Sequence, residues 1–116
     1  MSDETWAQVS LRIESPRLTV AEIERLLGTP SASKAADLWA AELTADSATG
    51  LDEQLRDVKT YLRDKAPVLA AMTGAKIGLS IGWTPRSPQD GIVLDDELIA
   101  LLAATRCHVL LDTYLD

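Results

Sequence analysis

Two segments of the chain alternate large apolar residues with small or polar ones over their whole length. They are WAQVSLRIE, residues 6–14, and KIGLSIGW, residues 76–83. Successive side chains of a strand point to opposite faces, so this period of two predicts strands with one face in the core. On KIGLSIGW the other face is nearly bare, because it carries only Gly78, Ser80 and Gly82. The fold must therefore bury one side of each strand, and the bare side is where a function could lie.

Local signals define a helix after the first strand. Thr19 and Glu22 form a T-x-x-E capping box, in which each side chain binds a free backbone amide of the other residue. Gly28 is placed to end this helix, as glycine commonly does just beyond a helical C-terminus. A second strand is expected over residues 37–43, where Trp39 begins a short alternating pattern.

The middle of the chain changes to a helical period. Apolar residues recur every three to four positions from residue 51 onwards, which predicts a stripe facing the core. Because Pro67 lacks an amide hydrogen, we expect two helical pieces, at about 52–64 and 66–73, with a break between them. Asp95 is expected to cap a last helix over residues 96–104.

A final strand over residues 107–114 completes the order β-α-β-α-α-β-α-β. This order predicts a two-layer, ferredoxin-like α+β sandwich with a four-stranded, mostly antiparallel sheet and the helices on one face. The strand order of that plan is 4-1-3-2. The 116 residues can bury one core, so we expect a single α+β domain over residues 1–116.

Charge and cysteine content limit the classes of partner. Eighteen acidic residues against eleven basic ones give a net charge of −7, and the basic residues are scattered. Nucleic acids and anionic membranes are bound by clustered Lys and Arg, so neither is an expected partner. The start MSDETWAQ lacks the pattern of a signal peptide, and a single Cys107 favours a reducing compartment. We therefore expect a cytoplasmic protein.

The C-terminal stretch GIVLDDELIALLAATRCHVLLDTY combines a helix pattern with a strand that ends in a D-x-Y triplet. It resembles the signature of a bacterial family known as domain of unknown function 4279. The matching positions are Gly91, Glu97, Leu98, Leu101, Ala103, Asp112 and Tyr114. The N-terminal VSLRIESPRLTVAEIERLLGTPSAS and Trp39 are similar to the family's opening, although its basic stretch is reduced here to Lys34. The resemblance implies a small stand-alone bacterial protein and brings no established activity or catalytic residues.

No constellation of catalytic or metal-binding residues is recognisable. The one histidine, His108, follows Cys107 on a strand, so the two side chains point to opposite faces and cannot act on one atom. We expect Cys107 to fill the core as a small apolar residue. The run Asp95-Asp96-Glu97 opens a helix, where acidic groups cap free amides. The glycines of GAKIGLSIG lie within a strand, so they form no phosphate-binding turn, and we expect no cofactor and no metal.

Alternation also fixes which residues occupy the open face of the sheet, opposite the helices. Glycine within a strand weakens it and often marks the close approach of another backbone or of a ligand. The candidate interaction face consists of Ser10, Arg12, Gly78, Ser80, Gly82, His108, Asp112 and Tyr114.

This face leaves three hypotheses open. The leading one is a non-catalytic module that binds another protein or a second copy of the chain as a homodimer, with an immunity-type role as one form. The alternative is a small-molecule or enzymatic site on the same face, with Arg12 binding an anion and His108 and Asp112 transferring protons. The third is a surface that meets only water.

Overall fold

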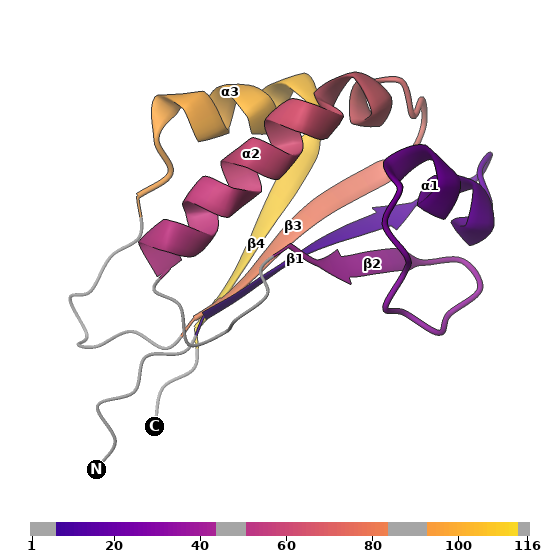
Figure 1. Cartoon of the computed structure of the whole chain (residues 1–116), viewed down its shortest axis with the longest axis horizontal. Coiled ribbons are helices and arrows are strands. Elements are labelled where there is room, and N and C mark those ends of the chain that lie inside the picture. The colour runs from indigo at the N-terminus through magenta and orange to yellow at the C-terminus, as the bar shows by residue number, and fades with distance from the viewer. Residues whose placement is uncertain (1–6, 44–50, 84–92, 114–116) are drawn as a thin grey trace, which may run out of the picture.

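The structure is a computed structural model that describes residues 7–43, 51–83 and 93–113. Its described part is an α+β fold with an open four-stranded mixed sheet and three helices (Figure 1). The elements are β1 (Ala7–Glu14), α1 (Val20–Leu27), β2 (Trp39–Glu42), α2 (Leu51–Ala70), β3 (Lys76–Trp83), α3 (Asp96–Ala104) and β4 (Cys107–Thr113). Trp6, Tyr114 and the expected loop over residues 84–91 lie outside the described residues.

The strand order is β2-β1-β3-β4, so the expected order 4-1-3-2 is wrong. Strands β1 and β3 are central as expected, but the two edge strands are exchanged. β1 pairs with β2 and β3 in antiparallel fashion, and β3 pairs with β4 in parallel.

The length of α1 explains the exchanged edges. A ferredoxin-like β-α-β unit needs a helix that carries the chain back along the strand. Helix α1 and strand β1 both have eight residues. A residue adds more than twice as much length in a strand as in a helix, so α1 is less than half as long as β1. Instead α1 lies beyond the end of the sheet, and β2 returns directly beside β1, which leaves the edge beside β3 to β4 (Figure 1).

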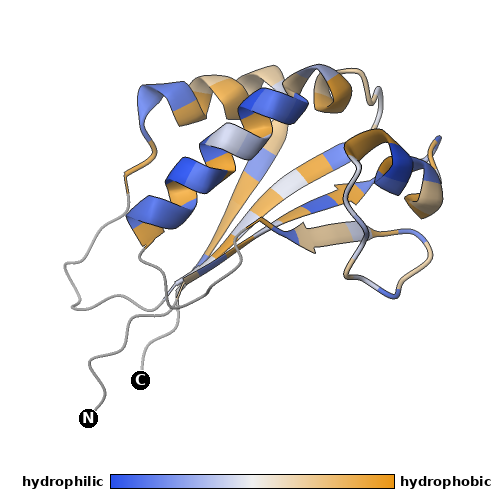
Figure 2. Cartoon of the chain, in the orientation of Figure 1, coloured by the Kyte–Doolittle hydropathy of each residue, from blue (hydrophilic) through white to orange (hydrophobic). Residues whose placement is uncertain are grey.

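The predicted register of the central strands is confirmed. Ile77, Leu79 and Ile81 are buried, and they are paired with buried residues of β1. Trp83, the last residue of β3, is also buried, at 7% exposed. Helices α2 and α3 lie side by side over this face of the sheet (Figure 1), and the core fills the space between. Figure 2 shows the hydrophilic outer surface that α2 turns to solvent.

The predicted break at Pro67 is absent, because α2 is one helix of 20 residues that contains this proline. Proline removes a single hydrogen bond, the one its own amide would donate to the carbonyl of Arg63. The Pro67 carbonyl still accepts a helical hydrogen bond, since the Ala71 amide donates to it at 3.2 Å. Leu69, buried in the core two residues beyond Pro67, holds the last turn against the sheet.

The predicted start of α1 at Thr19 is confirmed. The Thr19 hydroxyl accepts a hydrogen bond from the Glu22 amide, and the Glu22 carboxylate accepts one from the Thr19 amide. Gly28 ends α1 in the left-handed conformation. Glycine adopts this conformation without steric cost. Within the described residues, no helix is both long enough and apolar enough to cross a bilayer.

Candidate functional site

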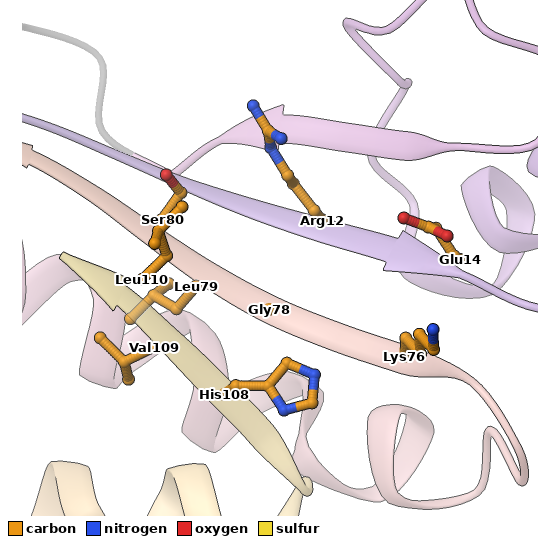
Figure 3. A pocket seen from close by; sticks show the side chains of 9 residues that line it. All are labelled: Arg12, Glu14, Lys76, Gly78, Leu79, Ser80, His108, Val109 and Leu110. Atoms are coloured by element: carbon orange, nitrogen blue, oxygen red, sulfur yellow. The ribbon is translucent and has the colours of Figure 1, made fainter. Parts of the chain in front are cut away.

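The open face of the sheet brings the predicted residues together in rows that run across three strands. Arg12 of β1 is paired with Gly78 of β3, and Gly78 is paired in turn with His108 of β4. The neighbouring row consists of Ser10, Ser80 and Leu110. Strand alternation puts both rows on the face away from α2 and α3. Figure 3 shows the side chains of Arg12, Ser80, His108 and Leu110 on this face.

All residues of these rows except Ser10 line an open groove of about 230 Å³. Its floor is the backbone of β3 at Gly78, and its walls are the side chains of Arg12 on one side and of His108 and Leu110 on the other (Figure 3). The new strand order creates this shape. In the expected order β4 would lie beside β1, whereas here β3 lies between them and its bare face becomes the bottom of the groove.

Gly78 is not required by the packing of the protein itself. A Cβ atom added there would meet the His108 Cδ2 atom at 3.8 Å, an ordinary van der Waals contact. The backbone at Gly78 is also an ordinary strand with no positive φ angle. Nothing in the described structure therefore prevents a side chain at this position.

The other candidate residues differ in their accessibility. Arg12, His108 and Asp112 are exposed, and Ser10, Gly78 and Ser80 are partly exposed. Gly82 lies in the same register, paired with Gln8 and Asp112, but it is buried and offers no surface. Tyr114 lies outside the described residues. The accessible site is therefore the end of the face around Gly78.

A charged pair at one end of the groove was missed from the sequence. Glu14 and Lys76 are paired at its end, where they place opposite charges on neighbouring strands. Alternation places both residues on the open face, but their pairing follows from the antiparallel register of β1 and β3. Val109 also lines the groove, and its exposure of 37% depends on the position of β4 at the edge.

The geometry argues against proton transfer between His108 and Asp112 within one chain. Four residues of a strand span about 13 Å, which is far beyond hydrogen-bond distance for these two side chains. The side chain of Leu110 also lies between them on the same face. Arg12 is likewise separated from His108, because the whole width of β3 lies between their strands.

Cys107 is partly buried and packs against the core, as predicted. Burial raises the pKa of its thiol from 9.0 to about 11, although a hydrogen bond from the Leu79 backbone acts in the opposite direction. The thiolate is the nucleophilic form of cysteine. At neutral pH Cys107 is therefore a structural thiol.

The acidic run at residues 95–97 caps α3 and ties it to α2. The Asp95 carboxylate accepts hydrogen bonds from the Leu98 amide at 2.9 Å and from Lys59 Nζ at 2.6 Å. Glu97 forms an ion pair with Arg63. In the described part of the chain, no group of three or more His, Cys, Asp or Glu residues could hold a metal ion.

Comparison with known proteins leaves the geometry as the basis for function. No family model, no curated protein and no solved structure matches this chain. The resemblance to domain of unknown function 4279 thus stays a prediction.

Proposed function

We propose that the protein is a non-catalytic interaction module that binds another protein on the open face of its sheet. The observation that carries the proposal is the accessible backbone at Gly78. Glycine weakens a strand, and here no internal contact requires it. A partner that lies against β3 would require it, because any side chain at this position would hold the partner away from the backbone.

The walls of the groove supply the contacts that such a partner needs. Arg12 is exposed beside the floor, and arginine is enriched among the residues that dominate binding energy at interfaces. Leu110 is 61% exposed on the opposite wall and provides an apolar contact. A cationic and an apolar wall around a bare floor fit an extended segment of protein that carries an acidic group.

A small-molecule site is the weaker reading of the same groove. Ligand pockets commonly enclose about 300–1,000 Å³ and bury most of their ligand. The groove is smaller, at about 230 Å³, and its walls are exposed side chains. A protein partner needs no enclosure, since interfaces are broad and shallow.

The proposal takes the fold to be a two-layer domain with one face of the sheet left for the partner. It also places the protein in the bacterial cytoplasm, on the basis of the family resemblance and the single cysteine. A net charge of −7 would attract a basic partner over long distances. An immunity-type role, in which the module covers the surface of a basic toxin, is the form of the function that fits this charge.

The test uses four tagged proteins as baits in lysate from the cells that make the protein. These are the wild type, Gly78→Val, Arg12→Glu and the control Ala36→Val, which also adds bulk but in an exposed loop. We expect wild type and control to enrich the same partner, and both open-face variants to lose most of it. Equal enrichment by all four baits, or none by any, would overturn the proposal.

A further inference from the structure

The two edges of the sheet are protected to very different degrees. At the β2 edge, the Ala32 amide donates to the Ala40 carbonyl at 2.6 Å, and the Ala40 amide donates to the Ser31 hydroxyl at 3.1 Å. The chain thus covers this edge with its own loop. Strand β4 forms the other edge, and within the described residues it has a neighbouring strand on one side only.

The side chains of β4 are apolar where the strand is unpaired. Val109, Leu110 and Leu111 are 37%, 61% and 45% exposed. They lie on both faces, since Val109 and Leu111 are paired with core residues of β3 while Leu110 lies on the open face. Natural sheets commonly protect a free edge with charges, proline or a bulge, because unpaired backbone groups bind other strands. These three consecutive residues supply none of those devices.

Helix α3 extends this apolar surface above the strand. Glu97 faces α2 through its ion pair with Arg63. At about 100° per residue, Ile99 lies about 200° further around the helix and therefore points away from α2, on the side of the free edge. Ile99 is 54% exposed, and Ala103, one turn later, is exposed beside it. Figure 2 shows that α3 is predominantly hydrophobic after its acidic first turn. We call Ile99, Ala103, Val109, Leu110 and Leu111 the β4 edge surface.

We propose that the β4 edge surface binds a second copy of this chain, with the two β4 strands antiparallel and a two-fold axis passing through Leu110. An antiparallel strand pair centred on one residue is geometrically allowed, and it places side chains of the same face opposite one another. Leu110 then faces its own copy on the open side. Val109 faces Leu111 of the second copy on the helix side, together with the exposed side of α3.

The sequence of β4 is complementary to itself in this register. Apolar residues meet at each of the three central positions, and the same axis pairs His108 with Asp112 of the second copy. Cross-strand pairs of apolar residues stabilise a sheet. A ring N–H of His108 can also donate a hydrogen bond to the carboxylate opposite it. A register centred on Leu111 would instead place Leu110 opposite Asp112. The β4 edge surface itself contains no charged residue, so the net charge of −7 does not oppose contact there directly.

This dimer goes beyond the proposed function and does not rest on it. It joins two four-stranded sheets into one, with both open faces on the same side and the helices on the other. The two grooves at Gly78 would then lie on one continuous surface. A partner with two matching segments could occupy both, which raises the apparent affinity without any new contact.

Sedimentation velocity tests the dimer with four proteins in about 150 mM salt, which limits long-range repulsion. Wild type and the control Leu26→Lys are expected to sediment as dimers, with a mass of twice the 12.5 kDa of one chain. Leu26 is 49% exposed on α1, far from β4. Leu26→Lys therefore introduces the same charge as Leu110→Lys at another exposed leucine, away from the proposed interface. Leu110→Lys is expected to sediment as a monomer, because two lysines would meet at the axis. Gly78→Val is expected to remain a dimer, which separates this test from that of the proposed function.

A disulfide tests the register independently of any loss of binding. Opposite Cα atoms of an antiparallel pair lie about 4.5–5.5 Å apart, within the range that a disulfide spans. In a Cys107→Ser background, Leu110→Cys should form a covalent dimer on mild oxidation, and Leu26→Cys should not. A monomeric wild type, a dimeric Leu110→Lys, or a Leu110→Cys variant that crosslinks no faster than Leu26→Cys would overturn the inference.

Discussion

Cys107 illustrates how the position of one residue decides its chemistry. It begins β4 opposite buried Ile77, with its side chain on the helix side of the sheet. A shift of one position would place the same thiol on the open face in the row of Arg12 and Gly78. Its partial burial therefore gives it a packing role, whereas its neighbour His108 is exposed to any partner.

We predict that Cys107 reacts slowly with a thiol reagent while the protein is folded. A pKa raised from 9.0 to about 11 leaves about one hundredth of the thiolate that an ordinary thiol has at pH 8. The rate with 5,5′-dithiobis(2-nitrobenzoic acid) should rise at least a hundredfold in denaturing urea. The variant Leu26→Cys in a Cys107→Ser background provides the exposed control. Equal rates for folded Cys107 and this control would show that the thiol is not held in the core.

At the scale of elements, α2 and α3 are joined at their polar sides by charge as well as by packing. Lys59 on α2 binds the Asp95 cap of α3, and Arg63 binds Glu97 one turn further along. The hydrogen bond from Lys59, followed by that from the Leu98 amide, lowers the pKa of Asp95. Asp95 therefore contributes to stability as a carboxylate, which makes its contribution dependent on pH.

The sign of this dependence follows from the lowered pKa. A carboxyl group whose pKa is lower in the folded state stabilises the protein above its unfolded pKa of about 4, and that contribution is lost as the pH falls through the folded pKa. Asp95→Asn keeps a capping side chain without the charge. We predict that Asp95→Asn has a lower urea midpoint than wild type at pH 7. The difference between the two midpoints should narrow below about pH 4. The control Asp37→Asn, in an exposed loop, should have the same urea midpoint as wild type. A midpoint difference for Asp95→Asn that does not change with pH would contradict the role of its charge.

Local signals predicted the elements well, because they act within a few residues. Thr19 and Asp95 cap helices at the expected positions, and the alternation of β3 identified its core residues Ile77, Leu79 and Ile81. The break at Pro67 was wrong because the burial of Leu69 outweighs one lost hydrogen bond. The strand order was wrong because it depends on how far α1 can carry the chain, a property of three dimensions that no local pattern contains.

The candidate site could be predicted only in part for the same reason. Alternation correctly put Arg12, Gly78 and His108 on one face, but the row that they form depends on which strands are neighbours. The buried Gln54 was missed as well. It lies on the apolar stripe of α2, and its side-chain amide donates to the Ala7 carbonyl at 2.8 Å. A polar residue on such a stripe gives no sign in the sequence of the partner that satisfies it.

At the scale of the whole molecule, the sheet divides the protein into two unlike sides. One side carries α2, α3 and the core, and the described part of the other carries a groove with a bare floor (Figure 1, Figure 3). The β4 edge surface adjoins that groove, since Val109 and Leu110 belong to both. Binding at the groove and pairing at the edge would therefore use neighbouring parts of one surface.

The most direct test of this division is photo-crosslinking in the cells that make the protein. A photoreactive benzoyl-phenylalanine is placed at His108, on an exposed wall of the groove, or at Thr60 on the exposed surface of α2 as the matched control. We expect adducts of defined mass from position 108, including one to another protein, and none above background from position 60. Adducts from position 60 alone, or equal labelling from both positions, would contradict the claim that the open face is the binding surface.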